Sequence, residues 1–154
     1  MKSKIIISAI FIFNITGIIL NGNNFFMGNN PTYLNCAFSI FYVLLWISSS
    51  IYAYRKKELK FLKYMLIYWP IALVVSILYA IIVVLNTNGT TSGIFSNLNI
   101  FSNIIGLFDF ILFSPLYGLR LFLQFPITKY SVIIIAIPLM LIILAIGIFK
   151  DSKN

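Results

Sequence analysis

The sequence has no histidine, one cysteine and only three acidic residues, Glu58, Asp109 and Asp151. These acids lie far apart along the chain, so the sequence offers no pair of carboxylates for general acid–base catalysis. Without histidine, neither a Ser-His-Asp triad nor a Cys/His metal site can be assembled. A glycine-rich phosphate loop is also missing. We therefore expect no enzymatic activity, no cofactor and no metal site in this chain.

The lone cysteine, Cys36, excludes a disulfide within the chain, and we interpret it as a small apolar residue at the start of a helix. Charged residues are scarce as well. They make up 9% of the chain, whereas 61% is hydrophobic and the mean hydropathy is +1.03. A water-soluble domain of 154 residues cannot bury so much apolar surface. The composition therefore predicts a protein whose main solvent is a lipid bilayer.

Several apolar segments approach the length of about 20 residues that a helical crossing of a bilayer needs. They are residues 5–20, 33–54, 64–85, 104–125 and 130–149. We predict an all-α integral membrane protein, a bundle of about five hydrophobic helices that forms a single transmembrane domain over residues 1–154. The first segment follows two lysines, as in a secretory signal, but no small-residue cleavage site comes after it. We expect it to remain as an uncleaved first helix.

The most basic stretch of the chain lies between the second and third apolar segments. It holds five of the eleven Lys and Arg residues: Arg55, Lys56, Lys57, Lys60 and Lys63. Short loops rich in Lys and Arg stay in the cytoplasm, so this stretch predicts the orientation and a cytoplasmic N-terminus. The same side chains are expected to contact anionic lipid head groups. The basic residues that give the formal charge of +8 lie in short segments at the ends of the predicted helices, and this distribution does not favour nucleic-acid binding.

Small and hydrogen-bonding residues recur on one face of the segment 33–54. Ser39, Tyr42 and Ser49 belong to this face at helical spacing. In lipid, such residues mark the face that packs against neighbouring helices. We interpret the face as a packing seam, and the alternative is a polar conduction path lined by these three side chains.

The segment 64–85 carries a ladder of small residues. Ala72, Ser76 and Ala80 follow one another at four-residue steps, which places them on one face of a helix. Such a ladder lets another helix backbone approach closely. We expect this third helix to dock against the second.

Two ionisable residues lie within the apolar segment 104–125. Asp109 and Arg120 stand on either side of Ser114 and Pro115. Ionisable side chains at membrane depth are functional candidates by default. In one continuous helix they are eleven residues apart, about 16 Å along the axis, so each lies near its own end. We favour this crossing, with the proline as a kink.

The alternative is a re-entrant segment that folds back at the Ser114–Pro115 step, with four full crossings around it. Asp109 and Arg120 would then lie side by side as an ion pair, and the irregular backbone would need cover from protein or water. A crossing places the end of the fifth helix outside, whereas a re-entrant segment places it inside. Counting charges does not decide, because either path leaves nine basic residues inside and two outside.

Packing seams without catalytic groups favour a protein that acts through helix contacts. We expect an accessory or regulatory subunit of a membrane complex, or an immunity-type protector. Its partners would be the bilayer and either another membrane protein or copies of itself. The alternative is a transporter or pore component, including a holin-like protein, with Asp109 and Arg120 as its site. Heavy use of Ile, Asn, Lys and Phe suggests an AT-rich bacterial genome and hence a bacterial inner membrane.

Overall fold

The computed structural model describes residues 2–27, 29–87, 96–122 and 127–151, and every element within these ranges is helical. The elements are α1 (Lys2–Met27), α2 (Tyr33–Arg55), α3 (Leu59–Thr87), α4 (Ser96–Phe113), the 3-10 helix η1 (Ser114–Phe122) and α5 (Ile127–Asp151). Four stretches are long and apolar enough to cross a membrane: Lys4–Phe25, Tyr33–Arg55, Leu59–Ile82 and Asn103–Leu121. The all-helical class is thus confirmed, and these stretches are compatible with a multi-pass membrane protein.

The helix α2 is bounded by local hydrogen bonds that its sequence supplies. Thr32 caps its start: the Thr32 side chain accepts from the Asn35 amide at 3.3 Å, and the Asn35 side chain accepts from the Thr32 amide at 2.8 Å. At its end, Lys57 adopts a left-handed conformation with φ 51°, and the Glu58 amide donates to the Ala53 carbonyl at 2.9 Å. The chain therefore turns within a few residues and enters α3 at once.

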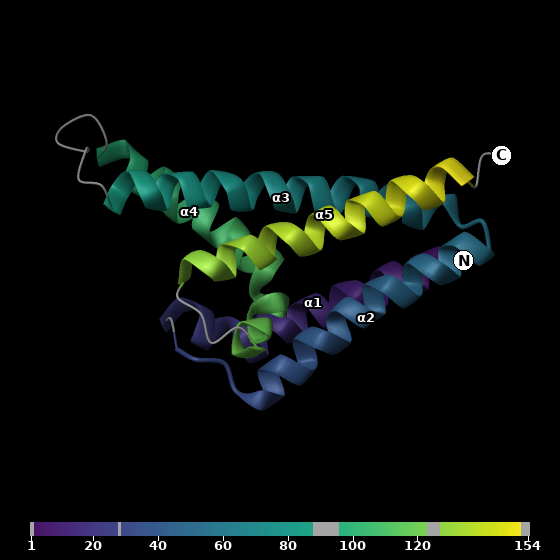
Figure 1. Cartoon of the computed structure of the whole chain (residues 1–154), viewed down its shortest axis with the longest axis horizontal. Helices are drawn as coiled ribbons and strands as arrows, with labels where there is room; N and C mark the ends of the chain where they lie inside the picture. Colours follow the sequence, from purple (N-terminus) through teal and green to yellow (C-terminus); the bar gives the residue numbers. More distant parts are fainter. Residues whose placement is uncertain (1, 28, 88–95, 123–126, 152–154) are drawn as a thin grey trace.

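The helices form two pairs with a third layer between them (Figure 1). One pair is α1 with α2, and the other is α3 with α5, which lie in contact along their length. Between the pairs, α4 runs inward from the end where α3 finishes, and η1 packs against α1 and α2. The start of α1, the α2–α3 turn and the end of α5 all lie at one end of the molecule, at the right of Figure 1.

We call this the basic end, because exposed cationic side chains gather there. They are Lys4, Arg55, Lys56, Lys57, Lys60, Lys63 and Lys150. The turn holds only part of the basic stretch, since Lys60 and Lys63 belong to the first turns of α3. The basic end therefore combines three separate segments of the chain in one positively charged surface.

The chain moves inward as it runs through α4 toward Pro115. Because α1 starts at the basic end and runs away from it, Gly17 lies deeper in the molecule than Gly22, by about 7.5 Å along the helix axis. Phe110 packs at Gly22, whereas Pro115 packs at Gly17. Pro115 is therefore farther from the entry end than Phe110.

After Pro115 the chain turns back toward the end from which it came. Tyr117 donates a hydrogen bond of 2.8 Å to the carbonyl of Asn29, which lies in the connection between α1 and α2 at that end. The continuous, kinked helix that we favoured for residues 104–125 is therefore not what forms, as far as residue 122. The helix breaks at Ser114 and the chain reverses, which is the geometry of the alternative. We call residues 96–122 the returning hairpin.

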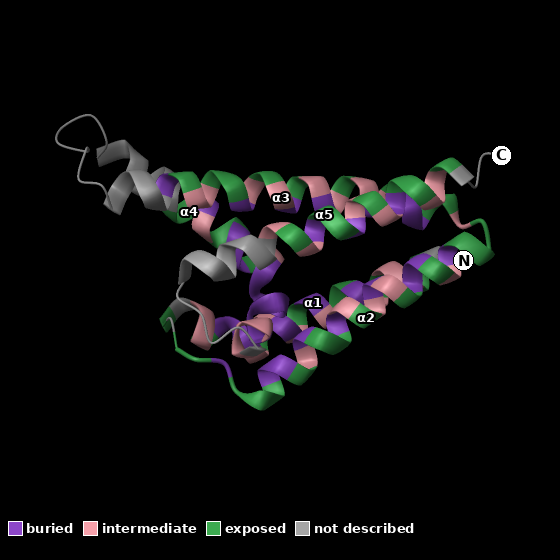
Figure 2. Ribbon diagram, in the orientation of Figure 1, coloured by how far each residue is buried: buried purple, intermediate pink, exposed green. Residues whose placement is uncertain are grey.

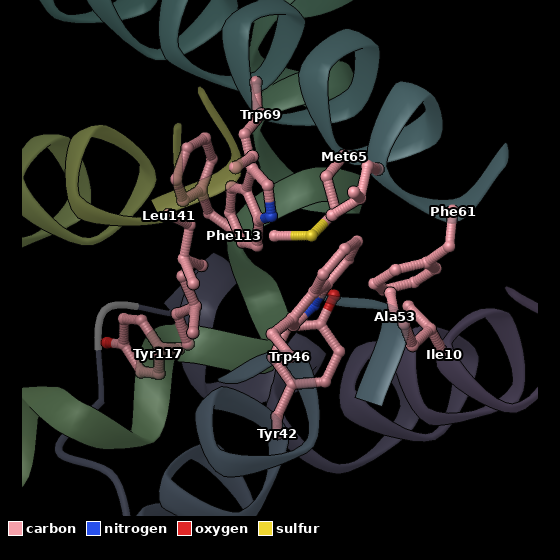
Figure 3. Close-up of a cluster of buried hydrophobic side chains, with 14 residues drawn as sticks. Ile10, Tyr42, Trp46, Ala53, Phe61, Met65, Trp69, Phe113, Tyr117 and Leu141 are labelled. Atoms are coloured by element: carbon pink, nitrogen blue, oxygen red, sulfur yellow. The ribbon is translucent and has the colours of Figure 1, made fainter. Parts of the chain in front are cut away.

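The core lies where the two helix pairs and the returning hairpin meet (Figure 3). Trp46 of α2 is fully buried there, with ring centroids 5.3 Å from Tyr68 and 5.0 Å from Trp69 of α3. Phe113 of the hairpin and Leu141 of α5 complete the cluster from the other side. Aromatic pairs of this kind contribute about 0.5–1.5 kcal/mol each beyond their area. They tie α2 to α3 in the middle of the molecule.

Candidate functional site

The returning hairpin is held by polar side chains of α1 and α2. The side-chain amide of Asn21 donates through Nδ2 to the Ser114 carbonyl at 2.7 Å. Ser39 donates its hydroxyl to the Pro115 carbonyl at 2.6 Å and accepts from the Gly118 amide at 3.0 Å. A break in a helix leaves backbone groups without partners, and such groups are costly when buried. Asn21 and Ser39 supply those partners, which is why the reversal forms here.

Two glycines let the hairpin approach its supports closely. A Cβ added to Gly17 would lie 2.7 Å from the Cβ of Pro115, and one added to Gly118 would collide with the backbone carbonyl of Asn35. Residues 114–118 are all buried, as the purple colour of η1 in Figure 2 makes visible. The reversal at residues 114–118 is therefore packed as part of the interior.

Asp109 lies on the inward arm of the hairpin, facing α3. Its side chain is only 3% exposed and is hydrogen-bonded to the hydroxyl of Ser76, whereas its Oδ1 atom has no hydrogen-bond partner. Tyr79 of α3 lies beside the same arm, and a Cβ on Gly106 would be 3.0 Å from its ring. The carboxyl group thus sits in a pocket of one hydroxyl, one phenol ring and apolar walls.

Arg120 lies on the outward arm and faces a different set of groups. Its Nη1 atom donates to the Tyr117 hydroxyl at 2.6 Å, and its guanidinium carbon lies 5.7 Å from the centre of the Tyr117 ring. Tyr117 in turn is bonded to the Asn29 carbonyl. Asp109 and Arg120 therefore do not form the ion pair that we expected of a folded-back segment, because one arm faces α3 and the other the α1–α2 connection.

The small residues of the α3 ladder lie in different surroundings. Ala72 is fully buried in the core, Ser76 faces Asp109 of α4, and Ala80 is half-buried. The backbone of α3 comes closest to α5 and α4, and its contact with α2 is smaller. The third helix contacts the second through Trp46, Tyr68 and Trp69, whereas Ser76 of the ladder faces the hairpin. Docking of the two helices through the ladder itself stays a prediction.

The three polar residues on the inner face of α2 have separate partners. Ser39 serves the hairpin, as described above. Tyr42 accepts a hydrogen bond of 3.3 Å from Asn14 of α1, which also donates to Tyr68 of α3 at 2.9 Å. Ser49 is buried and lines an open pocket of about 470 Å³ near the basic end, together with Ile5, Ile6, Ser48 and Tyr52.

The polar residues of α1 were missed as site residues by the sequence reasoning. Asn14, Gly17 and Asn21 are all buried and form one face that supports the hairpin and the Tyr42–Tyr68 contact. Their spacing of three and four residues was available in the sequence, since asparagine and glycine inside an apolar run mark a helix face that meets protein.

Among the residues that the structure describes, no group of three His, Cys, Asp or Glu side chains could hold a metal ion. Comparisons with protein-family models, with curated proteins and with solved structures find no match for this chain.

Proposed function

We propose that the chain is a non-catalytic subunit of a bacterial membrane complex, and that it acts by packing an outward helix face against an apolar helix of a partner protein. The accessory, regulatory and immunity-type roles all belong to this class, because each depends on recognition between helices within the bilayer.

The distribution of exposed side chains supports insertion in a membrane with one orientation. Large apolar residues are exposed along the sides of the helices, for example Phe11 at 61%, Ile67 at 61% and Ile143 at 69%. Exposed Lys and Arg gather at the basic end, which favours a cytoplasmic location for it. In this orientation the N-terminus and the end of α5 are cytoplasmic, and the returning hairpin enters from the opposite side.

The pairing of the internal polar groups supports a contact function over a transporter or pore. Ser39, Tyr42 and Asn14 are used in hydrogen bonds within the fold. A conduction path needs polar groups that face a continuous water-filled space. The polar face of α2 instead supports the hairpin and neighbouring helices, which leaves the outward surface for recognition.

The outward face of α5 carries the proposal. Ala136, Met140, Ile143 and Gly147 are exposed and follow one another at steps of four, three and four residues, so they form one stripe. A Cβ added to Gly147 would meet nothing within 4 Å. A glycine that no part of the fold requires, placed on an exposed apolar face, is suited to close approach by another helix.

Photo-crosslinking in living cells tests this proposal. A photoreactive phenylalanine analogue placed at Ile143 is expected to form an adduct of discrete mass with a second membrane protein. The same analogue at Leu78, an exposed position on α3, is the matched control and is expected to form none. Gly147→Leu should abolish the Ile143 adduct, because its side chain blocks the approach, without lowering the unfolding temperature of the purified protein.

Three outcomes would overturn the proposal. The first is an Ile143 position that yields no adduct. The second is an adduct with twice the mass of this chain, which would identify a second copy as the occupant. The third is an Ile143 adduct that survives Gly147→Leu, which would remove the glycine from the contact.

A further inference from the structure

The carboxyl group of Asp109 is buried, and neither helix packing nor the binding of a partner on α5 requires an acidic residue there. It lies on α4, 3% exposed, and one of its oxygens has no hydrogen-bond partner. From α3, Ser76 provides a hydroxyl, and among the residues that the structure describes, Tyr79 is the titratable group that interacts electrostatically with the carboxylate. From α1, the groups that meet this part of α4 are Gly22 and the ring of Phe25, which contacts Phe110.

No cation among the described side chains lies against this carboxyl. Arg120, the basic residue of the same hairpin, is bound to Tyr117 on the opposite arm. A carboxylate removed from water and left without a cation is strongly disfavoured relative to its neutral form. A protonated carboxyl has one O–H donor and fewer acceptor sites to satisfy, which suits a pocket that offers a single hydroxyl.

We propose that Asp109, with Ser76 and Tyr79, forms a proton-binding site inside the returning hairpin, in which the Asp109 carboxyl group carries the proton while α4 is packed against α3. Loss of the proton places an uncompensated negative charge between α4 and α3 and weakens their contact. Proton uptake at Asp109 therefore holds the hairpin in place. This inference is independent of any partner on α5.

Labelling with an apolar carbodiimide tests the protonation state directly. Dicyclohexylcarbodiimide enters lipid and reacts with protonated carboxyl groups in apolar surroundings. In membrane vesicles near neutral pH, peptide mass spectrometry is expected to locate an adduct on Asp109 and none on Glu58, which lies at the α2–α3 turn. The adduct should diminish as the pH is raised and should be missing in Asp109→Asn.

Stability measurements supply a second readout that does not depend on access of the reagent. Because the packed hairpin binds the proton, the unfolding temperature of the detergent-solubilised protein should fall as the pH rises from mildly acidic values through neutral. Asp109→Asn keeps the shape and the neutral charge, so its unfolding temperature should lose this dependence. Ser48→Ala removes an exposed hydroxyl of α2 that bonds to the Leu45 carbonyl, leaves the carboxyl and its surroundings intact, and should retain it.

Either of two results would overturn the inference. One is an Asp109→Asn protein with the same pH dependence as the unmodified chain, together with no Asp109 adduct at neutral pH. The other is an adduct that disappears when Na⁺ or K⁺ is added at constant ionic strength, since protection of that kind identifies a cation site rather than a proton site.

Discussion

At the scale of single residues, Gly118 determines whether the outward arm of the hairpin can dock on α2. Its hydrogen in place of a Cβ lets the backbone come against the Asn35 carbonyl and the Cys36 amide. Both neighbours are backbone atoms in the first turn of a capped helix, so neither can rotate away as a side chain would. The contact therefore tolerates no added carbon.

We expect Gly118→Ala to lower the free energy of unfolding by about 1–3 kcal/mol, because the methyl group forces η1 away from α2. The matched control is Gly147→Ala, where the methyl group meets open space. Its helical position predicts a stabilisation of about 0.5–1 kcal/mol. Denaturant unfolding in detergent, followed by tryptophan fluorescence, measures both. Equal effects of the two substitutions would show that η1 does not lie against α2.

At the scale of elements, η1 depends on its neighbours more than any other helix. A 3-10 stretch of nine residues is unusually long. The backbone carbonyls of Ser114 and Pro115 lie at the break. The side chains of Asn21 and Ser39 donate hydrogen bonds to them. The helix η1 is therefore stabilised by side chains of α1 and α2, which are distant from it in the sequence.

We expect Ser39→Ala to lower the free energy of unfolding by about 1–3 kcal/mol, since the Pro115 carbonyl and the Gly118 amide both lose their partner while buried. Ser48→Ala is the control: the Ser48 hydroxyl is exposed and bonds only to the Leu45 carbonyl in its own helix. Its effect should stay within about 0.5 kcal/mol. Thermal unfolding in one detergent compares the two, and a Ser39 effect no larger than that of Ser48 would contradict this account.

The elements were predictable where local patterns define them. The segment 33–54 agrees with α2 to within one residue, because Thr32 and the basic turn bound it on both sides. The segment 64–85 began too late, because Lys60 and Lys63 were counted as loop although they occupy the first turns of α3. Hydropathy detects the apolar part of a helix and does not detect its charged ends.

The candidate site was predictable only in part, because its contacts link distant segments. Pro115 indicated where the chain breaks, and Asp109 stood out as an acid in an apolar run. The ion pair of Asp109 with Arg120 was expected because the two residues lie at similar distances on either side of Ser114 and Pro115. That argument took no account of contacts with α3. Ser76, 33 residues before Asp109, takes that place instead. Only the packing of α4 on α3 identifies it, and nothing local in the sequence fixes that packing.

At the scale of the whole molecule, the reversal at Pro115 brings Lys150 to the same end as the α2–α3 turn (Figure 1). Charge counting left this open, because both paths distribute the basic residues equally between the two sides. The hydrogen bonds of Asn21 and Ser39 to the hairpin favour the path that returns. For the membrane-inserted protein that we propose, α1, α2, α3 and α5 would then cross the bilayer, which is an even number of crossings.

Cysteine labelling in spheroplasts tests this topology. In a Cys36→Ser background, single cysteines replace Asn30, Lys60 and Lys150, which are all exposed. We expect an impermeant maleimide to label position 30 in intact spheroplasts, and positions 60 and 150 only after permeabilisation. Position 60 is the control for the cytoplasmic side. Labelling of position 150 from outside would mean that the chain crosses once more than proposed.

The order of the hairpin's anchors along the chain has a consequence for biosynthesis. Asn21 and Ser39 are made well before Ser114 and Pro115, so the receiving surface is complete when the broken segment leaves the ribosome. The unpaired carbonyls of the break then meet their hydrogen-bond donors on arrival, with no later segment needed. The helix α5 follows the hairpin in the chain and packs on the core through Leu141 and Ala145. A nascent chain that assembles in this order always has hydrogen-bond donors ready for the backbone carbonyls of the break.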